Sequence, residues 1–138
     1  MAAVKESGLG WTTLTVDTSS GTANDIRADV GNFQFATPRG VQDVTGVDKS
    51  AYERLLLLAD FSITLNGVGF DDQASQAHVT LKTIPSSSAQ RTVALGVSGQ
   101  TLSNECIFTD YSITRGADGG MTWTAPGVLA DGTVPTWS

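Results

Sequence analysis

One stretch of the chain decides how the rest is interpreted. It reads Thr45-Gly-Val-Asp48-Lys-Ser-Ala51-Tyr-Glu-Arg-Leu55-Leu-Leu-Leu58-Ala-Asp60 and continues as Phe61-Ser-Ile63-Thr-Leu65-Asn-Gly67. In the first half, apolar side chains recur at helical spacing behind a residue that can cap a first turn. From Phe61 apolar and polar residues alternate, as they do in a strand with one buried face. The pattern predicts one helix over about residues 49–59, capped by Asp48 and buried through Tyr52, Leu55, Leu56 and Ala59, followed directly by a strand.

The same alternation predicts the other strands. Phe33 and Phe35 continue the pattern of Val30 with opposite parity, which requires a bulge or turn at Gly31-Asn32. The strand after the helix is expected to form a hairpin with residues 78–84. About seven or eight short strands with one flanking helix predict a mainly β fold, a sandwich or barrel-like sheet. The remaining predicted strands cover residues 11–16, 26–30, 91–97, 106–115 and 121–125.

The chain of 138 residues is long enough for one domain. We expect a single β-rich domain over residues 1–125 and an extended C-terminal arm over residues 126–138. Ordering a segment without sheet or helix period costs entropy that only buried contacts offset, so the arm is expected to dock on a partner. The alternative that it folds back on its own domain stays open. Its candidate interface residues are Val128, Leu129, Val134 and Trp137.

A second candidate surface precedes the predicted helix. Residues 37–46 break both periodicities and predict a loop of about ten residues, and loops of that length are often functional. Ordered irregular backbone needs hydrogen-bond partners, and a neighbouring subunit would supply them. The alternatives are an interaction loop and a packed connector. The candidate interface residues here are Thr37, Pro38, Arg39, Gly40, Val41, Gln42 and Asp43.

Composition and charge exclude several classes of protein. Eight basic against fourteen acidic residues give a net charge of −6, which argues against a protein that wraps a nucleic acid backbone directly. No apolar run approaches the roughly 20 residues of a membrane span, and no signal peptide begins the chain, so we expect a soluble protein of a cytoplasm without membrane partners. The single cysteine, Cys106, is expected to be a small buried side chain.

Residues for catalysis are scarce. His78 is the only histidine, and it lies in an alternating stretch, which is typical of a structural role. Asp71-Asp72 lacks the spaced ligands of a calcium loop. Residues 96–99 do not form a nucleophile elbow, and no phosphate-binding loop is present. The sequence predicts no catalytic residue, no cofactor and no metal, and therefore a protein that is not an enzyme.

Two stretches resemble the major tail tube proteins of bacteriophages with long, non-contractile tails. They are Asp43-Val-Thr45-Gly-Val-Asp48-Lys-Ser-Ala51-Tyr-Glu-Arg-Leu55 running into Phe61-Ser-Ile-Thr-Leu65-Asn-Gly67-Val, and Asp118-Gly-Gly-Met-Thr-Trp-Thr-Ala-Pro126 with Asp131-Gly-Thr-Val-Pro135. The resemblance implies a virion protein, assembled in the host cytoplasm, whose subunits close hexameric rings that stack into a tube. It also implies contacts with a tape measure protein and with tail terminator and tip proteins, and a channel through which DNA passes without specific binding.

Ring closure also follows from the physics of sheets, because joining subunit sheets removes exposed edge strands. An acidic chain would repel passing phosphates and keep the channel wall slippery. Two other classes stay open: a capsid decoration or head–tail joining protein, and a carbohydrate-binding module presenting Trp11, Trp123 and Trp137.

Overall fold

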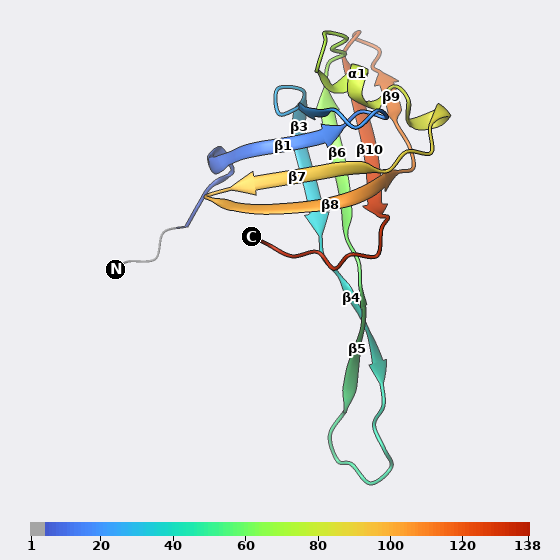
Figure 1. Ribbon diagram of the computed structural model, residues 1–138. Coiled ribbons are helices and arrows are strands. Elements are labelled where there is room, and N and C mark those ends of the chain that lie inside the picture. The colour runs from blue at the N-terminus through green and yellow to red at the C-terminus, as the bar shows by residue number, and fades with distance from the viewer. Residues whose placement is uncertain (1–4) are drawn as a thin grey trace.

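Two crossing layers of strands form the body of the molecule, and a two-stranded ribbon projects from it (Figure 1). This computed structural model describes residues 5–138. Within them lie β1 (Trp11–Asp17), β2 (Ala23–Asp25), β3 (Val30–Ala36), β4 (Arg39–Asp43), β5 (Arg54–Ala59), β6 (Ser62–Val68), α1 (Ala77–Leu81), β7 (Arg91–Val97), β8 (Gln100–Phe108), β9 (Ser112–Arg115) and β10 (Met121–Leu129), with short 3-10 turns η1 (Gly8–Gly10) and η2 (Ile84–Ser86).

One antiparallel sheet folds over on itself to make both layers. Its strand order is β2-β1-β7-β8-β10-β6-β3, and β9 pairs with the first half of β10. β10 joins the layers, because its residues 122–128 pair with β6 while residues 127–129 pair with β8. In Figure 1, β1, β7 and β8 lie in front of β3, β6 and β10. The fold is therefore a mainly β sandwich, as predicted.

Alternation places the core between the layers. Leu14 and Val16 in β1, and Val93 and Leu95 in β7, are buried, as the sequence predicted. β6 buries Ile63 and Leu65 in the same way. The bulge predicted at Gly31-Asn32 is confirmed by a register shift between Val30 and Asn32. Cys106 is buried, as expected.

Gly67 shows how tightly the layers meet. A Cβ atom at this position would lie 1.8 Å from Cε2 of Trp123, which crosses over it from β10. Because no side chain can approach an aromatic ring that closely, only glycine lets the indole enter the core, where it is 4% exposed.

The helix predicted over residues 49–59 is wrong. Residues 54–59 form β5, which pairs with β4, and Asp48 lies in the loop between them rather than at a helix cap. The predicted buried face is exposed: Tyr52 is 73% and Leu56 62% exposed. An isolated helix of about 11 residues is marginal in water, whereas the strand finds backbone partners in β4. For the same reason residues 37–46 are not an irregular loop throughout, since 39–43 are β4.

The strand predicted over residues 78–84 is also wrong. The helix of the body lies there, with Ala77, Thr80 and Leu81 buried at helical spacing. Four alternating residues were too few to separate the two periods. The expected hairpin with β6 is absent from the described residues, because β6 pairs with β3 and β10 instead.

The strand predicted over residues 26–30 is also wrong, because β2 ends at Asp25 and residues 27–29 form a turn before β3 begins at Val30. Two further boundaries differ from the prediction. The strand predicted over 106–115 is two strands, β8 and β9, separated by residues 109–111, and β8 begins at Gln100 directly after the turn at Ser98-Gly99. β10 continues to Leu129 instead of ending at Ala125. Among the described residues, no helix is long and apolar enough to cross a membrane.

Candidate assembly surfaces

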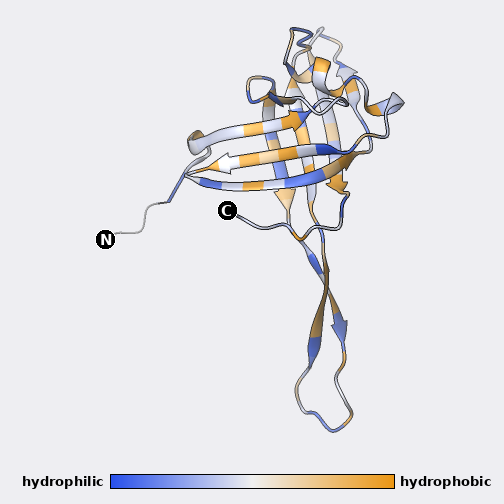
Figure 2. Ribbon diagram, viewed as in Figure 1, coloured by the Kyte–Doolittle hydropathy of each residue, from blue (hydrophilic) through white to orange (hydrophobic). Residues whose placement is uncertain are grey.

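The β4–β5 ribbon projects away from the sandwich (Figure 1). From here on it is called the arm, and it is distinct from the C-terminal arm predicted over residues 126–138. It exposes a run of leucines that no described residue of the same chain covers: Leu55 is 54%, Leu56 62%, Leu57 43% and Leu58 90% exposed. Figure 2 shows this apolar stretch along β5, outside the core. Contiguous exposed apolar surface on a soluble protein marks an interaction site. The arm is therefore the first candidate surface.

Both faces of the arm are apolar. Val41 lies opposite Leu56 and shares its face, whereas Leu55 lies opposite Gln42 on the other face. Leu57 covers Gly40, where a Cβ would meet the Leu57 side chain at 3.3 Å. A ribbon lying on one surface needs only one apolar face. Two apolar faces fit a ribbon that is covered from both sides.

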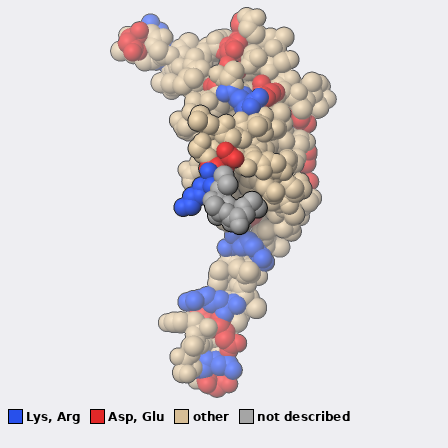
Figure 3. All heavy atoms as spheres, turned by 90° about the vertical axis from the view of Figure 1, so that its left-hand side faces the viewer, with Lys and Arg blue, Asp and Glu red and all other residues tan. Residues whose placement is uncertain are grey.

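The base and the end of the arm are held by polar contacts. At the base, the Arg39 guanidinium donates to the Leu57 carbonyl from Nε at 3.0 Å and from Nη2 at 2.9 Å. At the end, the Asp43 carboxylate accepts from the Thr45 amide at 2.9 Å and from its hydroxyl at 2.6 Å, and these bonds lower the pKa of Asp43. Figure 3 shows charge at the base and at the end of the arm with an uncharged stretch between.

The structure places the first set of predicted interface residues on this arm. Thr37 and Pro38 lead into it, and residues 39–43 are β4, all of them exposed. The leucines of β5 were missed as surface residues, because their helical spacing predicted a buried face. The signal that could have found them is the uninterrupted run of four leucines, which gives a strand no polar face.

The second predicted set lies at the end of β10 and beyond it. Val128 and Leu129 belong to β10, where Val128 lies opposite Ile107 and is 38% exposed. Residues 130–138 return along β8: the Ala130 amide donates to the Glu105 carbonyl at 2.9 Å, and Trp137 forms a bridge with Leu102. The ring of Trp137 lies 6.0 Å from that of Phe35.

Val134 and Trp137 remain 63% and 43% exposed. The C-terminal segment therefore contacts its own body through backbone bonds while it presents these two side chains outward. The two predicted sets do not meet in one site.

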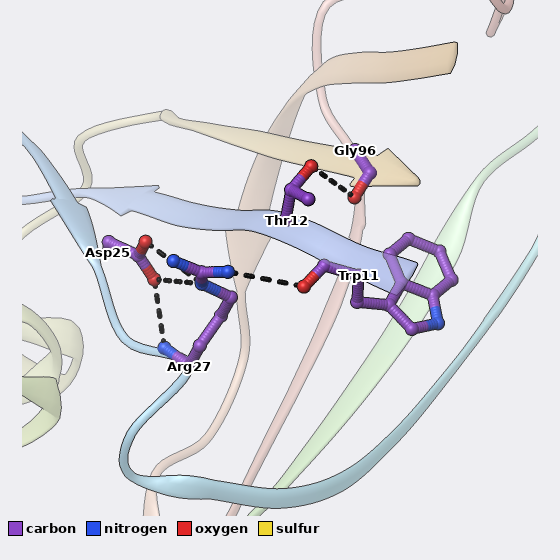
Figure 4. Close-up of polar contacts among 5 residues, drawn as sticks. All are labelled: Trp11, Thr12, Asp25, Arg27 and Gly96. Atoms are coloured by element: carbon purple, nitrogen blue, oxygen red, sulfur yellow. Dashed lines mark hydrogen bonds and ion pairs between the residues drawn. The ribbon is translucent and has the colours of Figure 1, made fainter. Parts of the chain in front are cut away.

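A groove of about 630 Å³ lies where β1 and β3 face each other without pairing. Trp11 and Phe33 line it, with ring centroids 5.0 Å apart in edge-to-face geometry. Arg27 also lines the groove, and Figure 4 shows that its guanidinium donates to the Trp11 carbonyl, at 3.1 Å, and pairs with Asp25, at 3.0 Å. Of the tryptophans expected to form an aromatic row, Trp123 is buried, so the three do not present one exposed surface.

Polar groups inside the body tie its parts together. Arg91, 2% exposed, donates to the Asp17 carbonyl at 3.1 Å, to the Thr80 carbonyl and to the Thr83 hydroxyl at 2.8 Å, and burial lowers its pKa. His78 shares a hydrogen bond of 3.1 Å with the Tyr111 hydroxyl. Within residues 5–138, no group of three His, Cys, Asp or Glu side chains is placed to hold a metal ion.

Neither protein-family models nor curated proteins match this sequence. Solved structures do match its fold. A chain from the tail of an empty gene transfer agent particle with C6 symmetry is 16% identical, with 97% of this chain and 98% of that chain covered and a TM-score of 0.71. A chain from the virion of a native gene transfer agent particle is 16% identical, with 97% and 99% covered and a TM-score of 0.70. The mainly β fold is thus shared over nearly the whole chain.

Proposed function

We propose that this chain is the subunit of a phage-like tail tube, forming hexameric rings that stack around a channel for DNA. The observation that carries the proposal is the full-length likeness to a chain from a C6-symmetric tail. Because 97% of this chain is covered, the likeness includes the arm as well as the sandwich. The role is structural, and the protein belongs to the tail of a virion assembled in the host cytoplasm.

The arm supports stacking. An apolar ribbon that extends beyond its own body can reach a copy in the adjacent ring, and its two apolar faces supply contact on both sides. Each large apolar side chain gains about 1.5 to 3 kcal/mol when it is fully buried. Each of the six copies in a ring contributes four leucines and Val41. The summed free energy of burying these side chains would strongly favour binding of one ring to the next.

The remaining partners follow from this role. A tape measure protein would occupy the channel during assembly, terminator and tip proteins would close the two ends, and DNA would pass without specific binding. Val134 and Trp137 are candidates for the contact between neighbouring copies, because backbone hydrogen bonds hold their segment near its two ends, at Ala130 and Ser138, while both side chains stay partly exposed.

The test is electron microscopy of the purified full chain at increasing concentration. We expect tubes whose cross-sections have sixfold symmetry. The variant Leu56→Lys should remain a folded subunit and fail to elongate, whereas Ser103→Lys, at an exposed position of β8, should form normal tubes. Isolated rings or trimers alone would favour a capsid decoration or head–tail joining protein instead, and a species that stays monomeric at all concentrations would contradict self-assembly.

A further inference from the structure

The back layer of the sandwich has an outward face with an unusual composition. β9, β10, β6 and β3 lie side by side, and their register places Trp123, Leu65 and Phe33 on the inner face. The alternate positions point outward. Those at the centre of the face are Asn32, Gln34, Thr64, Asn66, Thr122 and Thr124.

These outward side chains bind one another across the strands. The Asn66 amide nitrogen donates to Asn32 Oδ1 at 2.8 Å, and the Thr124 hydroxyl donates to Asn66 Oδ1 at 3.0 Å. The ladder thus crosses three neighbouring strands, β3, β6 and β10. Because its members satisfy part of one another's hydrogen-bonding capacity, the face presents fewer free donors and acceptors to a ligand.

No outward position of these four strands is charged. Ser112 and Thr114 extend the face on β9, Val68 bounds it at one end, and Ala36 and Val128 bound it near the arm. Soluble surfaces are about a quarter to a third Lys, Arg, Glu and Asp, so a solvent-facing sheet of this size would carry several charges. A protein interface would instead carry aromatic or other large apolar side chains at its centre. This face has neither.

The edges of this layer allow the face to continue from one copy to the next. Among the described strands, β3 pairs only with β6, and β9 pairs only with β10. All three pairings within the layer are antiparallel, so β3 and β9 run in opposite directions. Copies related by rotation can therefore place β9 of one beside β3 of the next with antiparallel pairing throughout.

We infer that the outward face of β9, β10, β6 and β3 lines the channel of the proposed tube and presents DNA with an uncharged wall of hydroxyl and amide groups. This inference rests on the proposed function and departs from the expectation of an acidic wall. Phosphate binding to protein is dominated by Lys and Arg, and this wall offers none to hold the duplex. None of the outward strand positions carries a carboxylate to repel it, and the nearest one, Asp110, lies at the edge, where it accepts from the Ser112 hydroxyl at 2.6 Å. The acidic residues of the chain lie elsewhere.

Cysteine labelling on intact tubes tests which face lines the channel. Thr122→Cys and Thr64→Cys lie on the face, and the control Ser103→Cys lies on exposed β8 in the other layer. The native Cys106 is fully buried, and burial raises the pKa of its thiol to about 12, so it stays silent. With a maleimide-linked gold cluster, we expect gold along the axis of Thr122→Cys tubes and along the outer rims of Ser103→Cys tubes. Gold on the outer rims of Thr122→Cys tubes would overturn the inference.

A charge test measures the consequence for DNA. One Thr122→Lys substitution places six cations in each ring of a sixfold tube. Tubes assembled with a short fluorescent duplex and then washed by pelleting should retain it in Thr122→Lys at about 50 mM salt and lose it by about 200 mM. Unmodified and Ser103→Lys tubes should retain at least tenfold less. Equal retention by unmodified tubes would contradict an uncharged wall. If the unmodified chain forms no tubes, the proposed function fails. That outcome is distinct from a failure of the channel-face inference, which requires tubes whose channel is lined by another surface.

Discussion

β5 and β6 follow each other along the chain with only Asp60 and Phe61 between them, yet their apolar residues have opposite fates. In β6, Ile63 is 1% and Leu65 0% exposed, whereas the leucines of β5 are 43% to 90% exposed. β6 alternates apolar with polar residues and so has one face to bury, but after Arg54 every residue of β5 is apolar. Alternation builds a body that is complete by itself. An uninterrupted apolar run leaves a surface that its own chain does not bury.

The largest expected effect separates the two strands by stability. Leu65→Ala should lower the free energy of unfolding by about 2 to 5 kcal/mol, because it removes transfer energy and leaves a cavity in the core. Leu56→Ala should change it by less than about 0.5 kcal/mol, because the side chain is already in water. Reversible denaturant unfolding of dilute subunit measures both. Equal losses would show that the arm packs as core.

The next prediction separates the two faces of the arm. Leu55→Lys and Leu56→Lys each remove about 1.5 to 3 kcal/mol of apolar burial per copy, which corresponds to a rise of roughly ten- to hundredfold in the concentration needed for assembly. Light scattering against concentration measures the threshold, and a thermal melt of each subunit serves as control. If one of the two variants assembles like the unmodified chain, the arm is covered from one side only.

A smaller effect tests how tightly the body is closed. Gly67→Ala should cost about 1 to 3 kcal/mol, because the new Cβ must displace the Trp123 ring. Gly40→Ala in the arm meets only the flexible Leu57 side chain at 3.3 Å and should cost less than Gly67→Ala. Calorimetry of both variants, with tryptophan fluorescence to report the ring, measures the difference. A larger loss for Gly40→Ala would reverse the comparison.

The last prediction concerns the chemical reactivity of two thiols and involves no change in stability. Burial, with a contribution from Glu105, raises the pKa of Cys106 to about 12, so its thiol stays protonated at pH 8 and reacts only after unfolding. A cysteine introduced as Leu58→Cys should react at once, because that position is 90% exposed. Reaction with a disulfide reagent, with and without denaturant, distinguishes them. Rapid reaction of Cys106 in the folded subunit would show that the body opens readily.

Much of the body could be predicted from sequence because its strands obey a single period. β1, β6 and β7 alternate over six or seven residues, and the bulge at Gly31 follows from a change of parity. β5 and α1 could not be predicted locally. Leu55 to Leu58 fit either period, and their strand conformation depends on pairing with β4. Residues 78–81 are too few to separate helix from strand.

The candidate surfaces were predicted only in part for a related reason. Residues 37–43 were chosen because irregular backbone needs hydrogen-bond partners, but β5 of the same chain supplies those partners to residues 39–43, so their role as an interface stays a prediction. Leu56 was assigned to the core because an apolar side chain is normally buried in its own chain. The uncharged outer face of β6 and β10 is invisible until the register aligns Thr64 with Pro126 and Asn66 with Thr124. Alternation along one strand shows which of its residues share a face. Which residues of different strands lie together on a surface depends on the pairing of the strands.

The narrowness of the arm has a mechanical consequence. It is a ribbon two strands wide, with a register irregularity between Arg39 and Val41 and one guanidinium clamping its base at the Leu57 carbonyl. A sheet closed into a barrel resists bending, whereas a two-stranded ribbon twists and flexes more readily. In a stack joined through such ribbons, curvature would concentrate between rings. Each ring would then keep a circular channel while the stack of rings bends at the junctions between them.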